Sequence, residues 1–141
     1  MENGKKKILV IDDEKMNIIA LAHYLKDKYE IIVATDGETG LEAAEKHIPE
    51  LILLDIIMPD MSGFEVIEKL KTINTTKEIP VLFITGLNNA ENEEKGIELG
   101  AVDFITKPFN KVIVVTRVET QFKLLEYKEK INELNLLLGK K

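Results

Sequence analysis

Three aspartates follow short apolar runs in this sequence, a position that favours metal binding. Asp12 and Asp13 come directly after 8–11, and Asp55 comes directly after 51–54. Each run is too short for a core helix and is typical of a buried strand. Carboxylates at neighbouring strand ends repel one another unless a cation joins them, and Mg²⁺ is the hard cation that suits their oxygens. We therefore predict a Mg²⁺ site at Asp12, Asp13 and Asp55.

Two further polar residues follow later apolar runs. Thr85 comes after 81–84, and Lys107 comes shortly after 102–105. With Mg²⁺ shielding the charge, Lys107 can pair with a phosphoryl oxygen, Thr85 can donate a hydrogen bond, and a carboxylate can attack phosphorus. Phosphoryl transfer is thus the predicted chemistry, whereas the lack of a Gly-rich phosphate loop leaves nucleotide binding unsupported. In the alternative interpretation, Asp12 and Asp13 only cap the helix that follows.

The elements that must position these residues alternate along the chain. Five apolar runs are separated by segments of helical period, which is typical of an α/β doubly wound parallel sheet in a single domain. The common strand order for five strands is 2-1-3-4-5, in which strands 1 and 3 are neighbours at the point where such sheets bind ligands. We expect strands near 8–11, 31–34, 51–54, 81–84 and 102–105, and helices near 17–29, 37–47, 64–73, 91–99 and 111–138.

Composition excludes several functional classes. The 141 residues include no cysteine, which excludes disulfides, zinc–thiolate sites and cysteine nucleophiles and fits a reducing compartment. The basic start precedes an apolar run too short for a signal peptide or a membrane span. The net charge of −6 argues against direct nucleic acid binding. We expect one cytoplasmic domain that binds neither membrane nor nucleic acid.

Four segments of the sequence resemble the receiver domain of two-component response regulators. The resemblance extends from about Lys6 to about Leu125, so we predict a receiver domain at 1–125. The most specific segment reads Asp-x-x-Met-Pro-x-Met-x-Gly over 55–63. The four segments are Val10-Ile11-Asp12-Asp13-Glu14, Leu53 to Gly63, Ile84-Thr85-Gly86 and Lys107-Pro108-Phe109.

The resemblance implies a role for each acidic residue. Asp55 matches the position that accepts the phosphoryl group. Asp13 and Asp55 match the positions that bind Mg²⁺ directly, and Asp12 matches one that acts largely through water. The backbone carbonyl of Ile57 would complete the metal ligands that the protein supplies.

The resemblance also implies how the signal is passed on. Lys107 matches the lysine that meets the phosphoryl group, and its peptide bond to Pro108 is expected to be cis. Thr85 and Phe104 match the pair of switch residues. Because Phe104 lacks a phenolic hydroxyl, its rotation would depend on packing alone.

The predicted function is a phosphoacceptor signalling module. A sensor histidine kinase or phosphotransfer protein would donate the phosphoryl group to Asp55 in a Mg²⁺-dependent reaction, and the domain's surface would change for a downstream output. The module would catalyse only its own phosphorylation and dephosphorylation, so we do not expect an enzyme with external turnover.

Two other functional classes share parts of this pattern. A Mg²⁺-dependent phosphatase with an aspartate nucleophile, similar to the haloacid dehalogenase group, needs an Asp-x-Asp motif, but Ile56 and Ile57 follow Asp55. A flavodoxin-like FMN carrier needs a phosphate loop after the first strand, where 12–14 would repel phosphate.

Two aliphatic residues stand beside the expected path of hydrolytic water. Ile57 lies two residues after Asp55, and Leu87 lies two residues after Thr85. In relatives these side chains flank that path. Our hypothesis is that they exclude the water and prolong the life of the acyl phosphate; the alternative is that they merely pack together.

The last predicted helix continues beyond the resemblance, as a helical extension at 126–141. Its apolar residues follow the 3-4 spacing of a coiled-coil seam over about two heptads, fewer than a convincing coiled coil needs. The seam predicts a homodimer, or a linker to an output domain of a longer regulator, and the alternative is an exposed helix end in a stand-alone receiver. The seam residues are Leu124, Tyr127, Ile131, Leu134 and Leu138.

Overall fold

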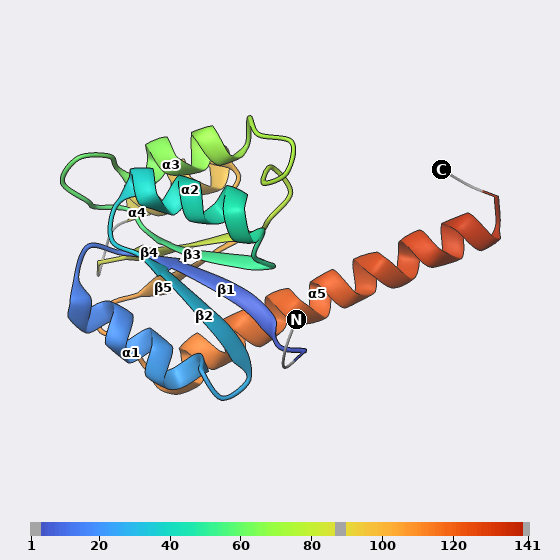
Figure 1. Ribbon diagram of the computed structural model, residues 1–141, viewed down its shortest axis with the longest axis horizontal. Helices are drawn as coiled ribbons and strands as arrows, with labels where there is room; N and C mark the ends of the chain where they lie inside the picture. The colour runs from blue at the N-terminus through green and yellow to red at the C-terminus, as the bar shows by residue number, and fades with distance from the viewer. Residues whose placement is uncertain (1–3, 87–89, 140–141) are drawn as a thin grey trace.

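A computed structural model describes residues 4–86 and 90–139 of the chain. These residues form a parallel sheet between two layers of helices (Figure 1). The strands are β1 (Lys6–Ile11), β2 (Tyr29–Ala34), β3 (Leu51–Asp55), β4 (Val81–Thr85) and β5 (Asp103–Thr106). The helices are α1 (Lys15–Leu25), α2 (Gly37–His47), α3 (Gly63–Leu70), α4 (Ala90–Leu99) and α5 (Lys111–Leu137).

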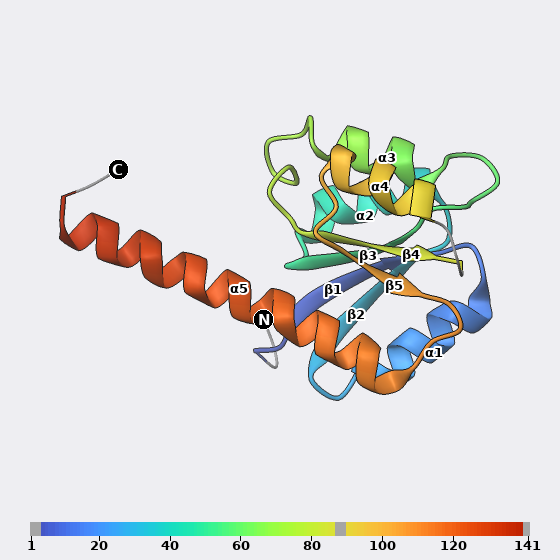
Figure 2. The same ribbon diagram turned by 180° about the vertical axis from the view of Figure 1, so that it is seen from behind.

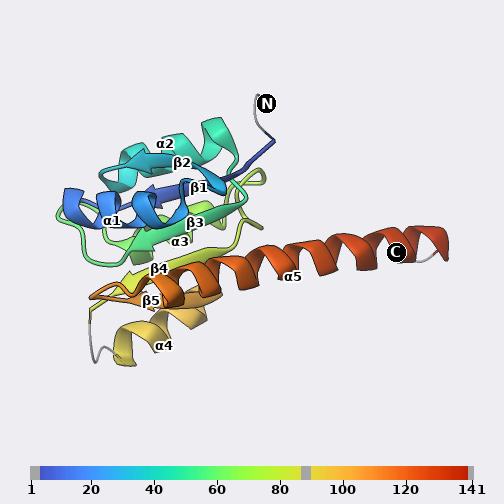
Figure 3. The same cartoon turned by 90° about the horizontal axis from the view of Figure 1, so that it is seen from below.

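The order of the strands confirms the predicted fold class. The sheet runs β2-β1-β3-β4-β5, and each neighbouring pair is parallel (Figure 3). Helices α2, α3 and α4 cover one face, and α1 and α5 cover the other (Figure 2). The doubly wound arrangement places β1 beside β3 at the switch point, as expected.

Successive side chains of each inner strand face opposite helical layers. Ile8 and Val10 pack with the buried residues of α1 and α5, whereas Leu9 and Ile11 pack with those of α2 and α3. Because the side chains of a strand alternate between its two faces, a strand covered on both faces must be apolar throughout. This explains why the inner strands can be recognised in the sequence as unbroken apolar runs.

The register brings the carboxyl ends of four strands to one edge of the sheet. Ile11 lies opposite Leu54 in the β1–β3 pair, and Thr85 lies opposite Thr106 in the β4–β5 pair. This edge therefore carries the predicted site residues Asp12, Asp13, Asp55, Thr85 and Lys107.

Two helices, α1 and α3, end earlier than expected, by four and three residues. The predicted helix at 17–29 was wrong at its C-terminal end, because α1 ends at Leu25 and Tyr29 begins β2. Tyr29 pairs with Lys6 of β1 and stacks on Phe122 of α5, with ring centroids 4.9 Å apart. Strand pairing and this aromatic contact thus outweigh the helical spacing. The helix expected at 64–73 runs from Gly63 to Leu70.

Helix α5 is the predicted long helix, and it has two parts. Asn110 caps its start by accepting a hydrogen bond from the Ile113 N–H at 3.2 Å. Val114, Val118 and Gln121 are buried in the first part. The second part leaves the body of the domain, as Figure 3 shows. Its Lys128 pairs with Glu78 of the domain at 3.3 Å.

Within 4–86 and 90–139, no helix combines the length and the apolar character that a membrane crossing requires.

Gly63 allows α3 to begin directly against the end of β3. Its N–H donates to the Ile56 carbonyl at 2.8 Å, and a Cβ at this position would overlap the carbonyl oxygen of Asp55. Ser62 and Glu65 form a capping box that fixes the first turn of the helix. The start of α3 therefore holds the Asp55 backbone in place.

We expect Gly63→Ala to lower the free energy of unfolding by about 1–3 kcal/mol, because the added methyl group pushes α3 away from Asp55. Denaturant unfolding followed by circular dichroism measures this loss. Gly86→Ala is the matched control, since a Cβ at Gly86 meets nothing within 4 Å. The control should stay within about 1 kcal/mol of the parent. Equal stability of the two variants would contradict the role given to Gly63.

Candidate functional site

The three predicted aspartates meet at the carboxyl edge of the sheet. One carboxylate oxygen from each of Asp12, Asp13 and Asp55 lies within 4.8 Å of the other two. Asp12 and Asp55 are 0% and 2% exposed, whereas Asp13 is open to solvent. Three negative charges this close together favour a divalent cation with oxygen ligands. The donor set fits Mg²⁺.

Asp12 is fixed by the start of α1. Its two oxygens accept hydrogen bonds from the Glu14 N–H at 2.9 Å and from Asn17 Nδ2 at 3.1 Å. The residue at the N-cap of α1 is Glu14, and its side chain makes no capping hydrogen bond. The alternative in which Asp12 and Asp13 cap this helix is therefore wrong. The hydrogen bonds hold the Asp12 carboxylate beside Asp55 instead.

Asp55 has one oxygen that accepts a hydrogen bond and one that does not. Its Oδ1 accepts a hydrogen bond from the Ile57 N–H at 3.3 Å, while its buried Oδ2 has no hydrogen-bond partner among the described residues. Burial raises the pKa of Asp55 to about 7, the charge of Asp12 adds to this effect, and the charge of Lys107 opposes it. A buried acceptor without a partner costs about 1–3 kcal/mol. This oxygen is therefore available to a cation or an incoming group.

Lys107 lies between two carboxylates. Its Nζ is 3.2 Å from Glu14 Oε1 and 3.6 Å from Asp55 Oδ2. Burial lowers the pKa of Lys107, but the charges of Asp55 and Glu14 outweigh burial and raise it above its usual value. The ammonium group therefore stays charged, with Glu14 as its nearer partner. The peptide bond to Pro108 is cis, as predicted.

A cavity of about 280 Å³ opens beside these groups. Thr85 lines it, and its hydroxyl is buried without a hydrogen-bond partner in the part of the chain that the structure describes. The Thr85 carbonyl accepts from the Lys107 N–H at 2.8 Å, so the two strand ends are tied together. The cavity brings the Thr85 hydroxyl, the Asp55 oxygen that accepts no hydrogen bond and the Lys107 ammonium group into one space.

Ile57 and Phe104 occupy the surroundings of the site. Ile57 lines the cavity with 70% of its surface exposed, so it stands at the mouth. Its expected partner, Leu87, lies outside the described residues, and the hypothesis about hydrolytic water stays a prediction. Phe104 is half-buried and stacks on Phe83 with ring centroids 6.3 Å apart. A Cβ at Gly96 of α4 would crowd both rings, at 2.8 and 3.1 Å.

Three residues of the site were not assigned roles from the sequence. Glu14 pairs with Lys107, Asn17 bonds to Asp12 and Glu14, and Asn92 of α4 lines the cavity. The spacing of Glu14 and Asn17 is a signal that could have been used, because residues three apart at a helix start lie side by side. Asn92 gives no comparable signal.

Known proteins with similar sequences and structures identify the family. The family model described as the response regulator receiver domain matches residues 8–119. Response regulator PleD of Caulobacter vibrioides is 44% identical over 122 residues, which are 84% of this chain and 27% of that protein. A probable cyclic di-GMP phosphodiesterase of Vibrio cholerae is 43% identical over 113 residues, which are 80% of this chain and 26% of that protein.

A solved structure agrees with the sequence relatives. The crystal structure of NtrX from Brucella abortus has a TM-score of 0.84 and 30% identity, covering 92% of this chain and 30% of that chain. The present chain spans about a quarter of the length of the two sequence relatives. The family model, the strand order and the aspartate cluster agree, and the chain belongs to the response regulator receiver domain family.

Proposed function

We propose that this domain is a phosphoacceptor whose acceptor residue is Asp55. The observation that carries the proposal is the buried Asp55 Oδ2, which has no hydrogen bond in the described residues and lies 3.6 Å from Lys107 Nζ. Asp12 and Asp13 stand beside it. We take the physiological phosphoryl donor to be a sensor histidine kinase or a phosphotransfer protein, because the chain belongs to the receiver family of two-component signalling.

Asp55 performs the transfer as a nucleophile. Its oxygen attacks phosphorus, the bond from phosphorus to the donor's imidazole nitrogen breaks, and the electron pair of that bond stays on the nitrogen. Lys107 exchanges part of its contact with Glu14 for a phosphoryl oxygen. The phosphoryl group ends on Asp55 as an acyl phosphate. The domain thus catalyses only its own phosphorylation and, later, the hydrolysis of its acyl phosphate.

Mg²⁺ is the proposed cofactor. Asp13, Asp55 and the backbone carbonyl of Ile57 would hold it directly, with Asp12 acting through water. The ion supplies positive charge that offsets the carboxylates and the phosphoryl oxygens. Support comes from the three carboxylate oxygens within 4.8 Å and from the buried Asp55 oxygen that accepts no hydrogen bond among the described residues.

The switch that follows phosphorylation is assigned to Thr85 and Phe104. The Thr85 hydroxyl is buried without a partner in 4–86 and 90–139, so it gains a hydrogen bond by moving toward a phosphoryl oxygen. Phe104 packs against Phe83 and next to Gly96, so a shift of its ring changes where α4 can lie. The output is a partner or domain that reads this surface. The lack of cysteine fits the cytoplasm as its compartment.

The phosphatase alternative is not favoured. It requires a general acid two residues after the nucleophile, and Ile57 at that position cannot donate a proton. The family match is to the response regulator receiver domain, whose relatives are phosphoacceptors.

Acetyl phosphate with Mg²⁺ should add one phosphoryl group to the protein, as measured by intact mass spectrometry. Asp55→Asn should add none, because the nucleophilic oxygen is lost. Asp60→Asn is the matched control, since it removes an exposed aspartate close by in the sequence, and it should be phosphorylated like the parent. Phosphorylation of Asp55→Asn, or catalytic release of phosphate from simple esters, would refute the proposal.

Stability should depend on pH through Asp55 when Mg²⁺ is removed. The pKa of Asp55 is raised to about 7 in the folded protein, so the folded state binds the proton more tightly than the unfolded state does. The resulting stability is complete below pH ~4 and is lost as pH rises through about 7. From pH 5 to pH 8 we expect the free energy of unfolding to fall by about 2–3 kcal/mol relative to Asp55→Asn.

Denaturant unfolding at several pH values, with a metal chelator present, measures this difference. Added Mg²⁺ should restore most of the lost stability at pH 8 in the parent and little of it in Asp55→Asn, because the ion binds the charged carboxylate. Parallel pH profiles for the two proteins would rule out a raised pKa at Asp55.

We propose further that the α5 extension forms a parallel homodimer. Ile131 and Leu134 are 58% and 54% exposed and lie on the seam that the sequence predicted. In a parallel pair, Lys123 of one chain and Lys128 of the other flank the seam, and like charges there oppose association. Lys128 is paired with Glu78 in its own chain at 3.3 Å, which offsets part of this repulsion.

Sedimentation should find a dimer that added salt strengthens, because salt screens the flanking lysines. Ile131→Gln with Leu134→Gln should weaken the dimer at least about a hundredfold, since each buried aliphatic side chain contributes about 1.5–3 kcal/mol. Asn132→Gln with Glu133→Gln, on the opposite side of the helix, is the control. A parent that sediments as a monomer, or a double variant that dimerises normally, would exclude the seam as an interface.

A further inference from the structure

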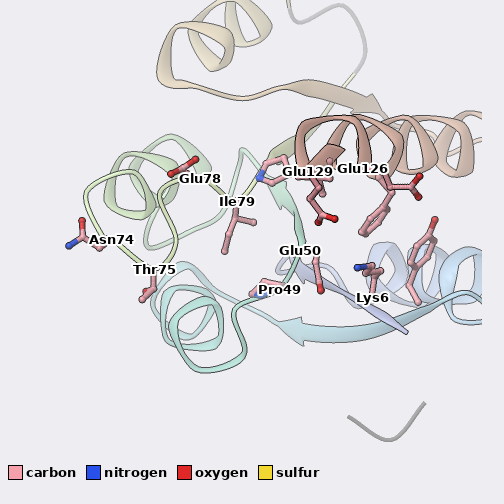
Figure 4. A pocket seen from close by; sticks show the side chains of 13 residues that line it. Lys6, Pro49, Glu50, Asn74, Thr75, Glu78, Ile79, Glu126 and Glu129 are labelled. Carbon is pink, nitrogen blue, oxygen red and sulfur yellow. The ribbon is translucent and has the colours of Figure 1, made fainter. Parts of the chain in front are cut away.

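A second cavity lies away from the aspartates, where α5 leaves the body of the domain (Figure 4). Its volume of about 470 Å³ exceeds the 280 Å³ of the cavity at Asp55, and the two share no lining residue. Sites for small molecules occupy about 300–1,000 Å³. Glu126 and Glu129 of α5 form one side of this cavity, and Lys6, Pro49 and Glu50 lie across from them in Figure 4.

The inner walls of this α5 cavity are apolar. Phe122 of α5 stacks on Tyr29 of β2, with centroids 4.9 Å apart and planes at 14°. Leu125 of α5 is half-buried, and Pro49 and Ile79 are buried on the opposite side. These groups offer a surface for the hydrocarbon part of a ligand, because removing apolar area from water stabilises a complex.

The charge around the α5 cavity is mainly negative. Glu50 accepts a hydrogen bond from the Lys7 backbone N–H at 2.8 Å, and Glu78 pairs with Lys128. The carboxylates of Glu126 and Glu129 make no hydrogen bond or ion pair with any described residue, and these two residues lie three positions apart on one side of α5. Lys6 supplies positive charge to the lining. Of the four lining carboxylates, Glu78 is thus offset by Lys128, and Glu126 and Glu129 are the two that have no ion pair or side-chain hydrogen bond among the described residues.

We propose that the α5 cavity binds a small organic cation, in which an ammonium, amidinium or guanidinium group is attached to an apolar body. The apolar body contacts Phe122 and Leu125, and the cationic group pairs with Glu126 and Glu129. Binding relieves the repulsion between these two like charges on one side of the helix. The carboxylates of the α5 cavity repel phosphates and other anions. The cavity therefore does not bind the phosphoryl donor that reacts at Asp55.

Occupancy of the α5 cavity also affects the α5 extension. A bound cation contacts α5 on one side and the segments before β3 and β4 on the other, so it ties the first free turns of the helix to the domain. The exposed Lys128–Glu78 pair beside it contributes little on its own, because solvent screens exposed ion pairs. A ligand that fixes these turns therefore regulates the helix independently of phosphorylation at Asp55.

Benzamidine is a suitable cationic probe. Benzoate and benzyl alcohol carry the same phenyl ring and serve as the anionic and neutral controls. Titration of the ¹⁵N-labelled protein by NMR should give saturable shifts at Tyr29, Phe122 and Glu126, and higher salt should weaken binding. Benzyl alcohol should bind at least fivefold more weakly than benzamidine, and benzoate should not bind. Equal binding of benzoate and benzamidine, or no saturable binding of benzamidine, would overturn the proposal.

Two double variants separate the site from a general charge effect. Glu126→Gln with Glu129→Gln should raise the Kd for benzamidine at least tenfold. Glu42→Gln with Glu133→Gln removes the same charge at exposed positions outside the cavity, and it should leave the Kd unchanged. If both double variants raised the Kd for benzamidine equally, the binding would depend on net charge alone and the proposed site would be refuted.

Hydrogen exchange tests the effect on α5. Saturating benzamidine should slow amide exchange at 126–130 several-fold in the parent and not in Glu126→Gln with Glu129→Gln. Saturable binding without slower exchange would refute the regulation of the helix. Because Asp55 is not involved, Asp55→Asn should bind benzamidine like the parent.

Discussion

Repulsion between carboxylates that water barely reaches is the interaction on which the rest of this structure depends. Asp12 and Asp55 are almost fully buried next to each other, and Asp13 adds a third charge at the surface. Lys107 offsets this charge only in part, because Glu14 is its nearer partner. Such a cluster would spread apart unless the fold resisted it. The register of β1 on β3, the hydrogen bonds to Asp12 and the close contact of Gly63 with the Asp55 backbone provide that resistance.

Much of this arrangement could be predicted from the sequence, because the strands are buried on both faces. Burial makes each strand an unbroken apolar run, and the polar residue that follows each run must lie at the edge of the sheet. Asp12, Asp55 and Lys107 could therefore be placed together without coordinates. The order of the strands came from what is common in such folds, and the structure agrees with it.

Other features depend on contacts that no local pattern contains. Tyr29 fits the spacing of a helix, and its place in β2 depends on Lys6 of β1 and Phe122 of α5, residues far away in the sequence. The pair of Glu14 with Lys107 joins residues 93 positions apart. The α5 cavity likewise combines strand starts, two loops and a helix. Contacts between residues far apart in the sequence, rather than low intrinsic secondary-structure propensity, limit what can be predicted from a single sequence.

The contact of Gly96 with two aromatic rings has a consequence for how the domain moves. Within α4, which the structure describes in full, only Gly96 is buried, and glycine inside a helix costs about 1 kcal/mol relative to alanine. Little apolar area therefore holds this helix to Phe83 and Phe104. Segments with few buried apolar contacts open at a smaller free energy than the whole fold does. Helix α4 should thus unfold locally while the sheet and the aspartate cluster stay intact, so it can exchange conformations without global unfolding.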